Sequence, residues 1–417
     1  MLKLLRRETR QKTQSFIVLD IGTEVVKALV CEHSNGAIAV RAIGRVTQKP
    51  GDMQSGAVMD IASVIENCMK AVEEAQKAAE LYPTDLIMGI AGELVKGMTN
   101  RTTYVRKDPA AKIDLGELKN IIHKVQRKSF EETRAQLAYD TGYNEIDVKL
   151  VNAAIVDVRI DGYRVANPIG FQGKEVQISI FNSFAPLVHY GALQTIAAEL
   201  EMNLIAIASE PFAVARSLEN EEDFDLNGIF MDIGAGTTDI AVVRNGVLEG
   251  TKMFTIGGRT FTKRLANTLN ISYQEAEDIK IAYSLGKLEK NSEKIVREAL
   301  DADSEVWIAG VVFSLSEFYH VEVLPSKIVL CGGAAHLPQI KQALEQYEWS
   351  EHLPFAKTPS ISMLNPRHIL RVRDETKQLD KPEDVTPLAL AKLGLEYVSE
   401  EHLLTRILKN VIRLMQI

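Results

Sequence analysis

The sequence has little cysteine, and its three thiols lie far apart. Cys31, Cys68 and Cys331 form no CxxC pair or other ligand-like spacing, so we expect no structural zinc and a reducing compartment. No segment approaches the roughly 18 uncharged apolar residues that a membrane-spanning helix requires. The first residues are basic but have no apolar core, which argues against a secretory signal. These absences predict a cytosolic chain.

The 417 residues otherwise have an ordinary globular composition, 46% hydrophobic and 25% charged. This length predicts about two to four folding units. The net charge of −8 is unevenly placed: residues 1–14 hold five basic side chains and one acidic one, and residues 401–417 hold three and one. An acidic body with basic ends argues against a nucleic-acid-binding protein, but permits ends that meet an anionic membrane surface.

Apolar spacing predicts an α/β chain. A buried strand is expected at Ser15–Asp20 because this run is apolar. The next two strands are expected at Val25–Cys31 and Ala37–Val46, which alternate in polarity. Longer segments with apolar residues at helical spacing predict a helix over Ala57–Leu81 and another over Ser304–His320.

Two segments about 210 residues apart follow one plan, which indicates an internal duplication. IVLDIGTEVVKALV begins at residue 17 and IFMDIGAGTTDIAVV at residue 229. Each has an apolar strand, an aspartate, a glycine-containing polar turn and a second strand. Such a turn lets backbone N–H groups approach phosphate oxygens closely. One copy alone could be a simple strand turn, but two facing copies would clamp a triphosphate.

The turns supply candidate ligands. The nucleotide-binding candidates here are Gly22, Thr23, Lys27, Gly234, Gly236, Thr237 and Thr238. Asp20, Asp232 and Asp239 could hold a hydrated Mg²⁺, which keeps several waters and needs few direct protein ligands. A third element, IVLCGGAAHLPQI over residues 328–340, places Gly332-Gly333 before a helix, which suits a base and its phosphate.

These residues resemble the actin-like ATPase superfamily, with phosphate motifs at Asp20–Lys27 and Asp232–Asp239 and an adenosine motif at Gly332-Gly333-Ala334. The resemblance implies an actin-like fold of two duplicated ribonuclease H-like lobes, with ATP and Mg²⁺ between them. It also implies that Gly258, Glu277 and Lys280 face the ribose and adenine.

Glu210 corresponds in this resemblance to the residue that positions the attacking water. The other interpretation is a carboxylate favoured by the dipole at a helix N-terminus. We expect slow ATP hydrolysis at most, since the superfamily resemblance implies nucleotide-dependent assembly more than turnover.

Within the superfamily the chain most resembles the FtsA family of bacterial cell-division proteins. The resemblance rests on Gly56-x-Val58-x-Asp60-Ile61, Ile90-Ala91-Gly92 and Asn167-Pro168-Ile169-Gly170. It implies self-association into filaments, binding of the C-terminal tail of FtsZ, and attachment to the inner face of the cell membrane. The implied domains are a basic extension (1–14), lobe 1 (15–84 and 182–222), an inserted α+β subdomain (85–181), lobe 2 (223–370, with a small subdomain at about 258–322), a return to lobe 1 (371–398) and a C-terminal amphipathic helix (399–417).

The C-terminal segment is amphipathic without reference to any family. Its apolar stripe consists of Leu403, Leu404, Ile407, Leu408, Val411, Ile412 and Met415, and its basic residues are Arg406, Lys409 and Arg413. This pattern favours a helix in a membrane interface. Because so short a helix needs a surface to fold against, docking on the protein's own core is the alternative.

Two further functions stay open, because the chain departs from the FtsA family at one surface. In that family Ser304–Leu315 corresponds to the helix that receives the acidic FtsZ tail, but here it carries no Lys or Arg. Glu210–Arg216 and Ser316–Tyr319 also resemble the PilM family, cytoplasmic adaptors of type IV pilus assembly that bind a pilus subunit peptide. A small-molecule kinase is less favoured, since no cluster of an acceptor base with sugar-binding groups stands out.

Overall fold

The computed structural model describes residues 14–92, 95–141, 148–218, 226–398 and 403–415. All but the last residue of the predicted basic extension lies outside the described residues, as do residues 219–225, 399–402 and 416–417. Within the described ranges, no helix is long and apolar enough to cross a membrane.

The first lobe is built on a six-stranded sheet in the order β11-β6-β1-β2-β3-β17. Its strands are β1 (Gln14–Ile21), β2 (Val25–Ser34), β3 (Ala37–Thr47), β6 (Asp85–Ile90), β11 (Asn203–Ser209) and β17 (Val372–Asp374). β1, β2 and β3 form an antiparallel meander, and β6 and β11 run parallel to β1. Helices α1 (Ile61–Ala79) and α3 (Leu187–Glu199) pack on one face of this sheet.

The second lobe repeats that topology. Its strands β12 (Gly228–Ile233), β13 (Thr238–Arg244), β14 (Val247–Phe254), β15 (Lys327–Cys331) and β16 (Ser360–Met363) pair in the order β16-β15-β12-β13-β14, with the same directions. Asp20 pairs with Lys27 across the first hairpin, and Asp232 with Asp239 across the second. The predicted duplication and the actin-like α/β fold class are therefore confirmed.

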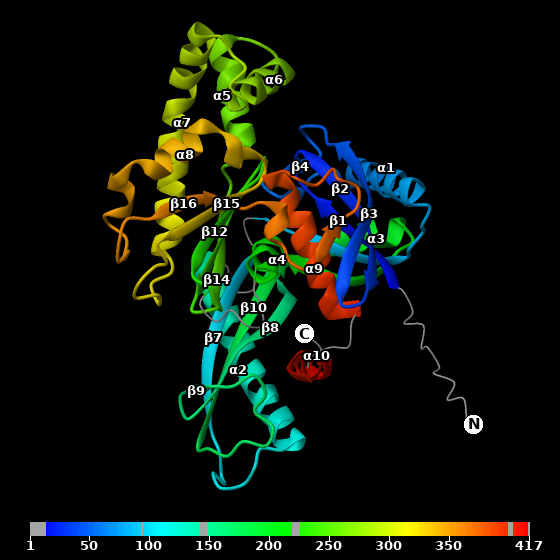
Figure 1. Ribbon diagram of the computed structural model, residues 1–417, viewed down its shortest axis with the longest axis vertical. Coiled ribbons are helices and arrows are strands. Elements are labelled where there is room, and N and C mark those ends of the chain that lie inside the picture. Colours follow the sequence, from blue (N-terminus) through cyan, green and yellow to red (C-terminus); the bar gives the residue numbers. More distant parts are fainter. Residues whose placement is uncertain (1–13, 93–94, 142–147, 219–225, 399–402, 416–417) are drawn as a thin grey trace, which may run out of the picture.

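Helices of the second lobe form its upper part in Figure 1. They are α5 (Gly258–Leu269), α6 (Tyr273–Ser284), α7 (Lys290–Ser316) and α8 (Pro338–Glu345). Their apolar faces meet around the fully buried Trp307. Short 3₁₀ turns lie at Gly333–His336, Tyr347–Ser350, Pro366–His368 and Pro382–Asp384.

An inserted unit extends the sheet of the second lobe. It contains β7 (Lys96–Val105), α2 (Leu115–Thr141), β8 (Val148–Ile160), β9 (Tyr163–Arg164) and β10 (Glu175–Pro186). β7 joins β14 through the pairs Gly250–Met98 and Thr251–Gly97, so nine strands form one sheet. The segment Asp85–Ile90, which the sequence grouped with the insert, is β6 and lies between β1 and β11 in the first lobe.

Two helix starts differ from the predictions. α1 begins at Ile61 rather than Ala57, because Asp60 caps it by accepting from the Ser63 N–H, and residues 57–58 form β5 with β4 (Met53–Gln54). α7 begins at Lys290 rather than Ser304. The sequence pattern did not indicate its first turns, because they are charged, face solvent and carry little apolar periodicity.

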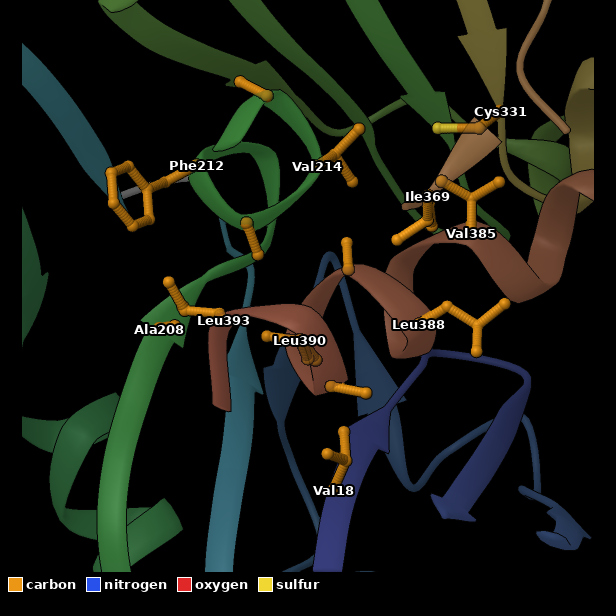
Figure 2. Close-up of a cluster of buried hydrophobic side chains, with 14 of the residues drawn as sticks. Val18, Ala208, Phe212, Val214, Cys331, Ile369, Val385, Leu388, Leu390 and Leu393 are labelled. Atoms are coloured by element: carbon orange, nitrogen blue, oxygen red, sulfur yellow. The ribbon is translucent and has the colours of Figure 1, made fainter. Parts of the chain in front are cut away.

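Two helices cross between the lobes. α4 (Glu210–Ser217) and α9 (Val385–Val398) pack on each other, and their side chains fill one apolar cluster that reaches both sheets. Figure 2 shows Val214 of α4 and Leu388 of α9 in this cluster, with Val18 and Cys331 from the two sheets. Because α4 begins at Glu210, this packing fixes that carboxylate between the lobes. All three cysteines are buried and free.

Candidate functional site

The turns of the two duplicated hairpins face each other between the lobes. A Cβ added at Gly236 would lie 2.7 Å from Thr23 Oγ1, and one added at Gly22 would lie 2.8 Å from the Val25 carbonyl oxygen. A larger residue at Gly236 would therefore push the turns apart. The two hairpins therefore face each other between the lobes, as the sequence predicts.

Four carboxylates gather between these turns: Asp20, Glu210, Asp232 and Asp239. Burial, together with the charge of the neighbouring Asp232, raises the pKa of Asp239 to about 8. Burial also raises the pKa of Asp20 to about 6, although the charge of Lys27 opposes this effect. The same burial, with the charges of Asp20, Asp239 and Asp232, raises the pKa of Glu210 well above its ordinary value. These shifts mark a crowded anionic site.

The segment that leads into α9 contacts residues of both hairpins. Lys27 Nζ lies 3.7 Å from the Asp384 carboxylate and donates to the Glu383 carbonyl. The Thr386 hydroxyl donates to Asp232, whose pKa is raised by burial and lowered by this bond. Sequence reasoning predicted Lys27 and Asp232 but missed Glu383, Asp384 and Thr386.

Gly332 is packed against Asp232. It has φ +88°, and a Cβ there would lie 2.2 Å from Asp232 Oδ1. Its conformation and this close approach both require glycine. Gly333 faces Glu383 with more space, since the nearest atom to an added Cβ is 3.8 Å away.

The residues predicted to face ribose and adenine form a second group in lobe 2. Lys280 Nζ donates to Glu277 Oε2 at 2.8 Å, to Thr262 Oγ1 at 2.8 Å and to the Gly258 carbonyl at 3.2 Å. A Cβ at Gly258 would lie 3.3 Å from both Ala334 Cβ and Lys280 Nζ. The structure thus brings Gly258, Glu277, Lys280 and Ala334 together.

Two threonines of the second turn have partners within the lobe. The Thr237 hydroxyl donates to Asp239 Oδ2 at 3.1 Å, and the Gly234 N–H donates to the Thr237 carbonyl at 2.9 Å. The hydroxyl of Thr238 donates to the Ile256 carbonyl and accepts from Trp307 Nε1 at 2.9 Å. The fully buried Thr238 side chain therefore supports the turn from the core of lobe 2.

The predicted metal ligands do not form a direct cage. In the described part of the chain, no group of three or more His, Cys, Asp or Glu side chains could hold a metal ion by itself. The charge of Asp232 nevertheless raises the pKa of both Asp20 and Asp239. This arrangement fits a hydrated cation better than a dehydrated one.

The stability of the ligand-free protein should fall between pH 6.5 and 8. The folded-state pKa of Asp239 is about 8, against an ordinary 3.8, so in this window the folded protein binds more protons than the unfolded chain. The free energy of unfolding therefore decreases as pH rises. His189 and His320, whose pKa values are lowered, are neutral in this window. Scanning calorimetry in EDTA should show the fall, and Asp239→Asn should make it smaller. A melting temperature that rises with pH would contradict this prediction.

The C-terminal amphipathic helix exists as α10 (Leu403–Met415), beside the insert (Figure 1). Its apolar residues Ile407, Leu408 and Val411 are buried in a cluster with α2 and β8. Lys409 Nζ lies 4.0 Å from the centre of the Tyr397 ring and donates to the Glu396 carbonyl at 3.2 Å. Of the two interpretations of this helix, docking on the protein itself describes the structure.

Comparisons with known proteins agree with this geometry. The family model for cell division protein FtsA matches residues 229–388. FtsA of Pseudomonas aeruginosa is 24% identical over 82% of this chain and 82% of its own length; FtsA of Neisseria meningitidis is 25% identical over 81% and 82%. Among solved structures, the PilM–PilN type IV pilus biogenesis complex matches with a TM-score of 0.63 and 19% identity, over 91% of this chain and 98% of that one. The resemblance inferred from the motifs is thereby confirmed: this chain is similar to FtsA in sequence and has an actin-like fold.

Proposed function

We propose that this protein is an actin-like cell-division protein that binds ATP and Mg²⁺ between its lobes. The observation that carries the proposal is the pair of hairpins with equal register, Asp20 opposite Lys27 and Asp232 opposite Asp239, whose turns meet. The FtsA relatives support the cell-division role.

Bound Mg²⁺ would offset the negative charge of the phosphates and of the surrounding carboxylates. Asp20, Asp232 and Asp239 would hold its water ligands, and Lys27 and Thr23 would contact phosphate oxygens. The glycines of both turns and of the Gly332-Gly333 turn leave room for the nucleotide to approach the backbone. Lys280 and Glu277 would face the ribose and adenine.

Glu210 would orient the attacking water in any hydrolysis. Burial and the neighbouring carboxylates raise its pKa, which makes the ionised carboxylate a stronger proton acceptor. A small cavity beside it is lined by Gly56, Gly89 and His189, and a Cβ at Gly89 would lie 2.7 Å from Glu210 Oε1. We expect slow turnover at most.

Isothermal titration calorimetry with ATP tests this proposal. The protein should bind ATP in the presence of Mg²⁺ and much more weakly in EDTA, because no cation then offsets the repulsion between the triphosphate and the ionised carboxylates. Absence of binding heat, together with an unchanged melting temperature at millimolar ATP·Mg²⁺, would contradict the nucleotide site.

We further propose that the protein self-associates into filaments and tethers an FtsZ filament to the cytoplasmic face of the membrane. α10 would bind anionic lipid through the apolar stripe that here faces the insert, with Arg406 and Arg413 on its exposed side. A single helix of this kind binds weakly, so filament formation would strengthen attachment through avidity.

A PilM-like adaptor role is the second candidate, favoured by the PilM fold similarity. Such a protein would bind a peptide from a pilus subunit in place of the FtsZ tail. Pull-downs with both peptides separate the candidates: retention of only the pilus peptide would replace the cell-division proposal. A small-molecule kinase would need turnover with small acceptors in a steady-state assay.

A further inference from the structure

Arg259 crosses from the second lobe to the first. It is the second residue of α5, and its side chain is almost entirely buried, with 9% of the residue exposed. Nε donates to Glu24 Oε2 at 2.7 Å, and Nη2 donates to the Thr23 carbonyl at 2.7 Å. Nη1 lies 3.1 Å from the Met53 carbonyl and 3.4 Å from that of Pro50. Every one of these acceptors belongs to the first lobe.

The backbone beside Arg259 is attached to the second hairpin turn. The Arg259 N–H donates to the Ala235 carbonyl at 2.8 Å, and the Gly258 N–H donates to the Gly234 carbonyl at 2.9 Å. The start of α5 and the second turn therefore form one hydrogen-bonded unit. Because the guanidinium donates to Thr23 and Glu24 of the first turn, this residue links the two turns directly.

Local preference does not explain an arginine at this position. A cation in the first turn of a helix is disfavoured by the helix dipole, and this turn carries no acidic residue to offset it. A departure from a local rule marks a position that serves another purpose. The planar guanidinium can serve several acceptors at fixed angles, which a lysine cannot do.

We propose that Arg259 is a positioning residue that holds the two hairpin turns closed and thereby slows the escape of bound nucleotide. The second part rests on the proposed ATP site; the first concerns the protein without ligand. Separation of the lobes at the turns requires the interlobe bonds of Arg259 to break. The opening rate, and with it nucleotide dissociation, is therefore set by this side chain.

The full-length protein tests both parts with Arg259→Gln and the control Lys263→Gln. Lys263 is exposed one turn later on α5, so its replacement removes the same charge without an interlobe bond. In stopped-flow displacement of a fluorescent ATP analogue, Arg259→Gln should speed dissociation by about tenfold or more, since several hydrogen bonds are lost. Arg259→Lys should give an intermediate rate, and Lys263→Gln the wild-type rate.

Hydrogen exchange without nucleotide provides the second readout. Peptides covering residues 22–26 and 234–238 should exchange faster in Arg259→Gln than in Lys263→Gln. A merely structural role would lower the melting temperature while leaving dissociation within twofold of wild type, and that result would overturn the proposal. If Arg259→Gln does not fold, Glu24→Gln decides: it should speed dissociation by about threefold, and an unchanged rate would overturn the proposal. If the wild type binds no analogue, the ATP site is wrong, and the exchange rates still decide whether Arg259 holds the turns together.

Discussion

Asp232→Asn should lower the affinity for ATP·Mg²⁺ by about 100-fold and should raise the melting temperature of the ligand-free protein at pH 8. Both effects follow from the crowding of four carboxylates between the hairpin turns. Asp232 adds to the raised pKa of Asp20 and of Asp239, so a neutral amide relieves repulsion when no cation is bound. The amide oxygen can still accept from Thr386. Calorimetric titration measures the affinity, and scanning calorimetry the stability.

Asp374→Asn is the matched control, because its effects should have the opposite pattern. The Asp374 carboxylate accepts from the N–H groups of Thr376, Gln378 and Leu379 at 2.9–3.0 Å, and these bonds lower its pKa. Its amide variant should melt at a lower temperature and bind ATP normally. An Asp232→Asn protein that binds ATP within threefold of wild type would show that the triphosphate lies elsewhere.

Removal of residues 399–417 should abolish sedimentation with anionic lipid vesicles and should increase self-association in solution above that of the full-length protein. The first effect follows from the loss of the amphipathic helix. The second follows from the insert, because Ile122 and Val125 of α2 are buried in the cluster that α10 completes, and an uncovered apolar face invites association. Vesicle sedimentation and analytical ultracentrifugation measure the two effects. Equal pelleting of the full-length and shortened proteins would remove the tether function.

Substitutions at two basic residues of α10 distinguish docking of the helix on the protein from its attraction to lipid. Lys409 contacts Tyr397 and Glu396 in the docked helix, whereas Arg413 is exposed. Lys409→Met should weaken docking and increase vesicle binding, although it removes a positive charge. Arg413→Met removes the same charge from the exposed side and should decrease vesicle binding. A decrease of equal size in both variants would mean that docking does not compete with lipid.

The hairpins could be predicted from sequence because their signal is local. An apolar strand that ends in Asp-Ile-Gly and resumes after a polar turn specifies both strands and the residues that face each other. β7 was missed because Lys96–Val105 is mostly polar, and its pairing with β14 spans about 150 residues. Arg259 and Thr386 were missed for a similar reason: their roles arise only when the lobes meet, and no neighbouring residue in the sequence indicates that contact.

The join between β7 and β14 also has a mechanical consequence. The nine-stranded sheet passes from the second lobe into the insert through only two backbone pairs, Gly250–Met98 and Thr251–Gly97, reinforced by the 2.8 Å bond from Arg101 to Glu249. Every other neighbouring pair of long strands in this sheet shares more residues. Under tension between the second lobe and the insert, we expect β7 to separate from β14 before any other pair of long strands. The strength of this pairing would then limit the force that a filament could transmit through the sheet.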